Sequence, residues 1–161
     1  MQNRHQARMA ALQALYQCEV LDNWNKDCVE LFFKTFYSEN AAELSEIRFL
    51  IDQETKNYAL EIVSAVGSNL QSFNIQIQNS LRGWTLQRIA AIDRAILRLA
   101  LAEKEISSDL NSSIIIDEAV NLAHEFGTDN SPAFINGVLE NLLNSVEDFS
   151  ESTANTKMKS Y

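Results

Sequence analysis

The chain has 161 residues, enough for one domain whose hydrophobic core needs no disulfide or metal ion. With four glycines and one proline, it has too few turn signals for a β-sandwich or β-barrel. The net charge of −9 argues against indiscriminate nucleic-acid binding, and no segment resembles a membrane span or a signal peptide. We therefore expect a soluble cytoplasmic protein, with Cys18 and Cys28 as ordinary thiols.

The distribution of arginine matters more than the net charge. Residues 1–18 contain no acid, and Asp93 is the only acid from Arg82 through Arg98. Two arginine-bearing segments could form a local anion-binding surface, although scattered arginines are more often solvated or paired with acids. Six of the seven arginines belong to these segments: Arg4 and Arg8 in the first, and Arg82, Arg88, Arg94 and Arg98 in the second.

Apolar residues recur at helical spacing from the first residues onward, which predicts an all-α fold. The first expected helix covers residues 4–20. A shorter helix follows, with Val29 and Phe33 on its apolar face. Residues 53–80 keep the pattern for several turns and predict a long amphipathic helix.

The second half of the chain continues the helical pattern. Residues 86–103 are apolar on most sides, so we expect a central helix, with Thr85 as its capping residue. Two further helices are expected over residues 114–126 and 132–146. Residues 1–146 are therefore predicted to form a single domain, and residues 147–161, which lack a sustained apolar pattern, a disordered tail.

The stretch FGTDNSPAF, residues 126–134, concentrates signals for a change of direction. Gly127 is well placed to end one helix in the left-handed conformation. Ser131 is expected to cap the next helix, and Pro132 to occupy its first position. The sequence thus predicts a tight connection between two helices.

Catalytic motifs are absent from the sequence. It has no glycine-rich phosphate loop, no His-x-x-x-His metal pair and no nucleophile turn of the G-x-S-x-G type. Asp117 and Glu118 are adjacent on an expected helix, so they point to different sides and cannot act as a facing acid and base. We therefore expect a binding protein that is not an enzyme and uses no metal or cofactor.

Three segments carry a resemblance to a known family. In order and spacing, RHQARMAALQALYQ, LQRIAAIDRAILRLALAE and IIIDEAVNLAHEFGTDNSPAFINGVLE resemble the bacterial NusB family of transcription antitermination factors. The block DEAV-x-LA-x-x-FG followed by F-x-NGVL is the most specific part. The resemblance implies an all-α fold of about seven helices in two packed subdomains.

The resemblance also implies partners and roles for single residues. Members of the family bind boxA RNA of ribosomal operons as a heterodimer with NusE, a small-subunit ribosomal protein, within the RNA polymerase antitermination complex. Arg4 and Arg8 match an arginine-rich RNA-binding motif, thinned here by the intervening His5 and Gln6. The other implied RNA-binding residues are Tyr16, Asn130, Ser131 and Phe134.

Several alternatives remain open from the residues alone. Tyr16 and Phe134 could belong to the core, although an exposed tyrosine and phenylalanine beside arginines would suit single-stranded RNA. Asp93 matches a family position that contacts NusE, but it could also pair with a neighbouring arginine. Two other functions compete: a protein-only adaptor that has lost RNA binding, and an accessory domain of an RNA methyltransferase, which the chain length disfavours.

Overall fold

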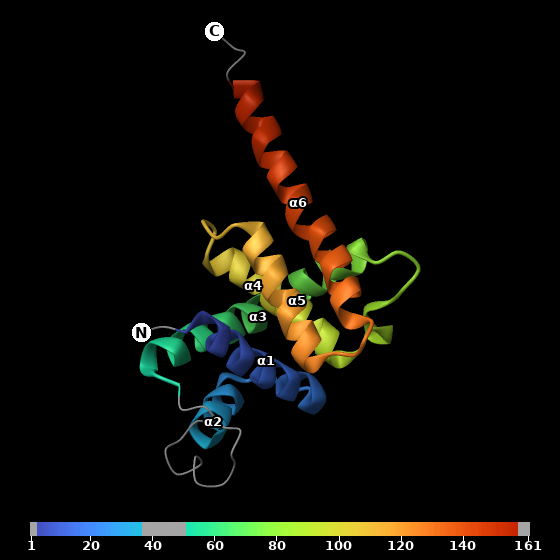
Figure 1. Cartoon of the computed structure of the whole chain (residues 1–161). Helices are drawn as coiled ribbons and strands as arrows, with labels where there is room; N and C mark the ends of the chain where they lie inside the picture. The colour runs from blue at the N-terminus through green and yellow to red at the C-terminus, as the bar shows by residue number, and fades with distance from the viewer. Residues whose placement is uncertain (1–2, 37–50, 158–161) are drawn as a thin grey trace.

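The computed structural model describes residues 3–36 and 51–157 and contains no β-strand within them, which confirms the predicted all-α fold. Six α-helices and one short 3-10 turn make up these described residues (Figure 1). The helices are α1 (Arg4–Leu21), α2 (Lys26–Phe36), α3 (Gln53–Ser80), α4 (Ala91–Ile106), α5 (Ser112–Phe126) and α6 (Ser131–Lys157), and the turn η2 (Leu86–Arg88) lies between α3 and α4.

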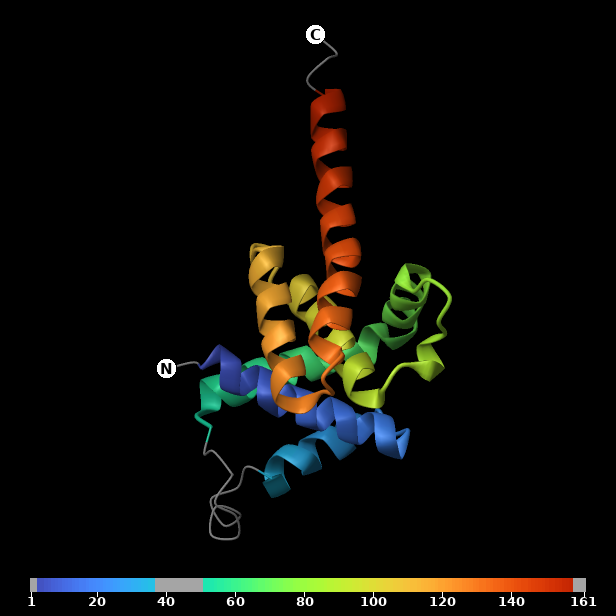
Figure 2. The same ribbon diagram turned by 45° about the vertical axis from the view of Figure 1, so that its right-hand side comes forward.

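One hydrophobic core joins both halves of the chain. Helix α1 packs against α2, α3 and α4, while α5 packs against α4 and α6, an arrangement visible in both ribbon views (Figures 1 and 2). Small side chains on the buried face of α1 allow this close packing: Ala7, Ala10, Ala11 and Ala14 are all buried. None of the helices within the described part of the chain is both long and apolar enough to cross a bilayer.

Short polar side chains begin three of the helices. The Asn3 carboxamide accepts a hydrogen bond from the Gln6 amide, and the Asp52 carboxylate accepts one from the Thr55 amide. The Asn111 carboxamide does the same for the Ser113 amide at the start of α5. Because the first amides of a helix have no partner within it, these contacts fix where each helix begins.

The prediction of one continuous helix over residues 86–103 is wrong. Leu86–Arg88 form a separate 3-10 turn, Ile89 and Ala90 are extended, and α4 begins at Ala91. Thr85 precedes the turn but its side chain makes no capping bond. The guanidinium of Arg94 donates to the carbonyl oxygens of Leu86 and Ile89 and so stabilises the break. The prediction that this helix is central is confirmed for α4, because residues 95–103 are all buried.

Helix α6 continues to Lys157, beyond residue 146, where the sequence predicts the folded domain to end. In both ribbon views its later turns run out past the other helices (Figures 1 and 2). The backbone of residues 147–157 is therefore helical where the sequence predicts a tail, and residues 158–161 lie outside the described residues.

Candidate nucleic-acid interface

Arg4 and Tyr16, two of the RNA-binding residues implied by the sequence, are exposed on α1. The Arg4 guanidinium carbon lies 4.9 Å from the centre of the Tyr58 ring of α3, a cation–π contact. Tyr16 is 44% exposed. Twelve residues of helix separate them, or about 18 Å along the axis. The same spacing turns the two side chains about 120° apart around the helix axis.

Arg8 is buried and does not share the exposed side of α1 with Tyr16. It is 4% exposed and donates from Nε and Nη2 to the Glu103 carboxylate at 2.9 and 2.6 Å. Its Nη1 lies 3.2 Å from Glu118 Oε2. Eight residues on an α-helix turn a side chain by about 80° from its starting direction, enough to move from surface to core. Arg8 and Tyr16, which the family resemblance implies as RNA-binding residues, therefore do not lie on one accessible face of α1.

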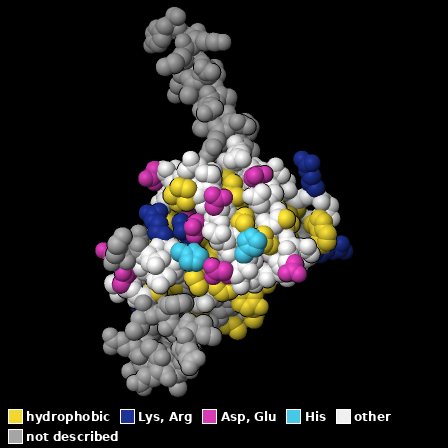
Figure 3. All heavy atoms as spheres, viewed as in Figure 1, with side chains coloured by type: hydrophobic (Ala, Val, Ile, Leu, Met, Phe, Trp, Pro, Cys, Tyr) yellow, Lys and Arg dark blue, Asp and Glu magenta, His cyan; other side chains and the backbone are white. Residues whose placement is uncertain are grey.

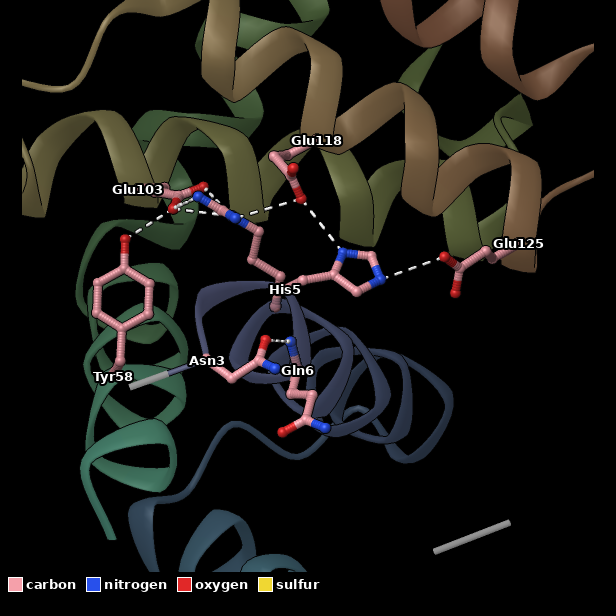
Figure 4. A network of polar contacts seen from close by, with 8 residues as sticks. Asn3, His5, Gln6, Tyr58, Glu103, Glu118 and Glu125 are labelled. Carbon is pink, nitrogen blue, oxygen red and sulfur yellow. Dashed lines mark hydrogen bonds and ion pairs between the residues drawn. The ribbon is translucent and has the colours of Figure 1, made fainter. Parts of the chain in front are cut away.

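The ion pairs of Arg8 belong to a polar network of residues from α1, α3, α4 and α5 (Figure 4). The Tyr58 hydroxyl donates to Glu103 at 2.7 Å, and burial together with this hydrogen bond raises the pKa of Tyr58 to about 12. His5 lies between two carboxylates of α5, with Nδ1 3.2 Å from Glu118 and Nε2 3.2 Å from Glu125. Within the thinned arginine motif, Arg4 is therefore accessible, whereas the side chains of His5 and Arg8 hold α1 against the neighbouring helices.

A hollow of about 410 Å³ lies beside Tyr16. Its walls come from α1, from the start of α4 and from the last residue of α5, namely Leu12, Gln13, Tyr16, Ala90, Ala91, Ile92 and Phe126. Sequence reasoning missed Phe126 as a site residue, although it immediately precedes Gly127 in the most specific motif. A tyrosine and a phenylalanine at one hollow are suitable for holding an unpaired base.

The connection from α5 to α6 differs from its predicted form. Gly127 is extended, with φ −89° and ψ −166°, so the prediction of a left-handed residue is wrong. Helix α6 begins at Ser131, and the buried Ser131 hydroxyl accepts a hydrogen bond from the Thr128 amide at 2.9 Å. This bond fixes the loop and leaves Ser131 unable to reach RNA. Asn130 is exposed, whereas Phe134 is half-buried and packs against the core.

Asp93, the proposed NusE contact, is 7% exposed and has an oxygen, Oδ1, without a hydrogen-bond partner. Neither of the alternatives foreseen from the sequence fits this position. A partner protein cannot reach the carboxylate, and the nearby Arg94 and Arg98 both pair with Glu19 of α1. These two arginines lower the pKa of Glu19, although its burial alone would raise it.

Replacing Asp93 with asparagine should stabilise the protein at neutral pH. Burial raises the pKa of Asp93 above its ordinary value, and a hydrogen bond with Ser131 offsets only part of this effect. An acid whose pKa is higher in the folded state destabilises that state when ionised, so stability falls as pH rises through the folded pKa. The stability difference between Asp93→Asn and the parent, measured by urea unfolding, should be clear at pH 7, shrink as the pH falls through the folded pKa of Asp93, and be lost by about pH 4. A constant difference would contradict this assignment.

No cluster of three or more His, Cys, Asp or Glu side chains suited to a metal ion occurs within the described residues. The charged side chains on the face drawn in Figure 3 are mixed, with acids and histidines near its centre. The chemistry available around Tyr16 is therefore stacking on aromatic rings and hydrogen bonding, and the accessible guanidinium of Arg4 lies about 18 Å away along α1.

Comparison with known proteins identifies the family. The model of the NusB family matches residues 5–144. The chain belongs to the NusB family. Proteins named transcription antitermination protein NusB include one from Geotalea daltonii, 32% identical over 92% of this chain and 99% of its own length. Another, from Sulfurimonas denitrificans, is 36% identical over 87% of this chain and 96% of its own length.

A solved NusB structure has the same fold. The T. maritima protein matches with a TM-score of 0.73 and 29% identity, covering 89% of this chain and 93% of its own. The NusB match includes α1, α4, α5 and the first half of α6, and therefore every residue considered above for RNA or partner binding except Arg4, which immediately precedes it.

Proposed function

We propose that this NusB-family protein binds single-stranded RNA of the boxA type and acts in the cytoplasm as a transcription antitermination factor with NusE. The observation that carries the proposal is the exposed Tyr16 beside a hollow that it shares with Phe126. Bases stack readily on such rings, whatever their sequence, while arginines hold the phosphates. The names of the relatives support the antitermination role.

The proposed RNA site consists of Arg4, Tyr16, Phe126 and Asn130, with Phe134 at its margin. The buried and paired Arg8 and the buried Ser131 are not retained as contacts. Acidic side chains nearby, Glu118 and Glu125, would repel phosphate. His5 lies between them, 3.2 Å from each carboxylate. We therefore propose weak binding by the protein alone and tighter binding by its complex with NusE.

Truncating Tyr16 should weaken RNA binding without unfolding the protein. Tyr16→Ala removes a stacking surface worth about 1 to 3 kcal/mol of binding free energy. Arg4→Ala removes one phosphate contact and should reduce the slope of log affinity against log salt by about 0.7. Filter binding of a boxA oligonucleotide at several salt concentrations measures both effects.

Val20→Ala is the matched control for Tyr16→Ala, because Val20 is an exposed apolar residue of the same helix and does not line the hollow. It should bind RNA like the parent. Equal affinity of Tyr16→Ala and the parent would remove the hollow from the RNA site. If the protein is instead a protein-only adaptor that has lost RNA binding, neither the free protein nor its mixture with NusE should prefer boxA over a scrambled sequence.

A further inference from the structure

The connection between α3 and α4 carries a second surface suited to a polyanion. Residues 62–92 contain no Asp or Glu, although the chain as a whole has 22 acids and a net charge of −9. The only charged side chains in this stretch are Arg82 and Arg88, which are exposed and form no ion pair within the described residues. At the right-hand edge of Figure 3, where Figure 1 places this connection, Lys or Arg side chains lie beside hydrophobic ones.

Trp84 is the most prominent side chain of this surface. It is 60% exposed between the two arginines in sequence, and Ile75 on the neighbouring turn of α3 is also exposed. A hollow of about 430 Å³ lies between α3 and the turn η2. Trp84 does not line it; its lining consists of amide and apolar side chains: Leu70, Gln71, Asn74, Ile75, Gln78, Asn79, Leu86 and Gln87. Exposed apolar side chains that are rimmed by polar ones are typical of a binding surface, and here Trp84 and Ile75 are exposed among amide and arginine side chains.

The backbone around Trp84 is held in place by one side chain of α3. Gln78 Nε2 donates to the Trp84 carbonyl at 3.1 Å, and Gln78 Oε1 accepts from the Leu86 amide at 2.8 Å. Gly83, with φ +77°, supplies the left-handed turn just before the tryptophan. The loop therefore has a defined shape before any ligand arrives, which reduces the entropy lost on binding.

We propose that Arg82, Trp84 and Arg88, with the adjoining amide side chains, bind a stretch of single-stranded RNA separately from the Tyr16 site. Trp84 stacks on an unpaired base and the arginines contact its phosphates. Exposed amides that both donate and accept, on Gln71, Asn79 and Gln87, match the edges of bases. An acidic peptide would use the arginines but would leave these amides and the flat ring without a specific role. This second site extends the RNA-binding function proposed above.

Fluorescence of Trp84 tests the proposal directly. Trp24→Phe leaves Trp84 as the only tryptophan, so quenching during titration with a single-stranded oligouridine reports on this surface alone. We expect saturable quenching, and in filter binding Trp84→Ala should weaken oligouridine affinity about 5- to 150-fold. Arg82→Ala/Arg88→Ala should lower the salt slope by about 1.4. Lys26→Ala/Lys34→Ala, which removes the same charge from exposed positions of α2, should change neither result.

The outcomes separate this surface from the Tyr16 site. Quenching that persists in a Tyr16→Ala background supports an independent site. Oligouridine binding without quenching, unaffected by Trp84→Ala, would overturn the inference and leave the proposed function standing. Equal quenching by polyglutamate at the same ionic strength would assign the surface to an acidic protein instead, and equal quenching by duplex RNA would exclude base stacking. Circular dichroism of each variant checks that the fold is unchanged.

Discussion

Replacing Arg8 with alanine should cost about 3 to 5 kcal/mol of folding free energy, the cost expected when one partner of a buried ion pair is removed. Glu103 is 1% exposed and would remain deep in the protein with only the Tyr58 hydroxyl to stabilise its charge. Glu118 would lose a cationic neighbour at the same time. Urea unfolding followed by circular dichroism measures the loss.

Two variants control this prediction. Arg4→Ala removes an arginine from the exposed side of the same helix and should change the unfolding free energy by less than about 0.5 kcal/mol. Arg8→Met/Glu103→Leu replaces both charges with side chains of similar size and should recover much of the lost stability, since the pair offsets a large desolvation cost. If Arg8→Ala unfolds like the parent and only its RNA affinity falls, the buried ion pair is not important for stability, and Arg8 returns to the RNA site.

The pattern of apolar residues was sufficient to predict most helices. It located α1, α3 and α5 to within a few residues, and it predicted the buried character of α4. It could not predict where α4 begins, because no glycine or proline marks the break at Ile89. The break is stabilised by Arg94, whose guanidinium donates to the carbonyl oxygens of Leu86 and Ile89, and a rule based on the spacing of apolar residues cannot detect this contact.

The environment of individual charged residues was harder to predict than the helices. Arg8 and Glu103 are 95 residues apart, so no local pattern distinguishes this arginine from the accessible Arg4. The same is true of Asp93, which lies on α4 but forms a hydrogen bond with Ser131 at the start of α6. Family resemblance indicates which positions matter, whereas the folded structure separates side chains that can reach a ligand from those that hold helices together.

The sequence predicts that a glycine is needed at position 127, but the predicted reason, a left-handed backbone, is wrong. Its backbone is extended, so any residue could adopt it, but the space for a side chain is missing. A Cβ atom there would lie 2.5 Å from Ser131 Cβ and 2.7 Å from the Ala123 carbonyl oxygen. The glycine is needed because the end of α5 and the start of α6 approach each other closely.

Gly127→Ala should therefore destabilise the protein by about 1 to 3 kcal/mol, the usual cost of forcing extra atoms into a packed site. The strain acts on Ser131 and the first turn of α6, so the variant should also disturb Asn130 and Phe134 and weaken boxA binding. Thermal and urea unfolding measure the first effect, and filter binding the second.

Gly137→Ala is the matched control, because Gly137 is exposed within α6 and a Cβ there meets nothing within 4 Å. Alanine in an open helical position should stabilise the protein by about 0.5 to 1 kcal/mol. The same substitution is thus expected to have opposite signs at two glycines ten residues apart. Stabilisation of both variants would contradict this prediction. It would mean that α5 and Ser131 can move apart without a loss of folding free energy, so that the α5–α6 connection is less tightly packed than the distances indicate.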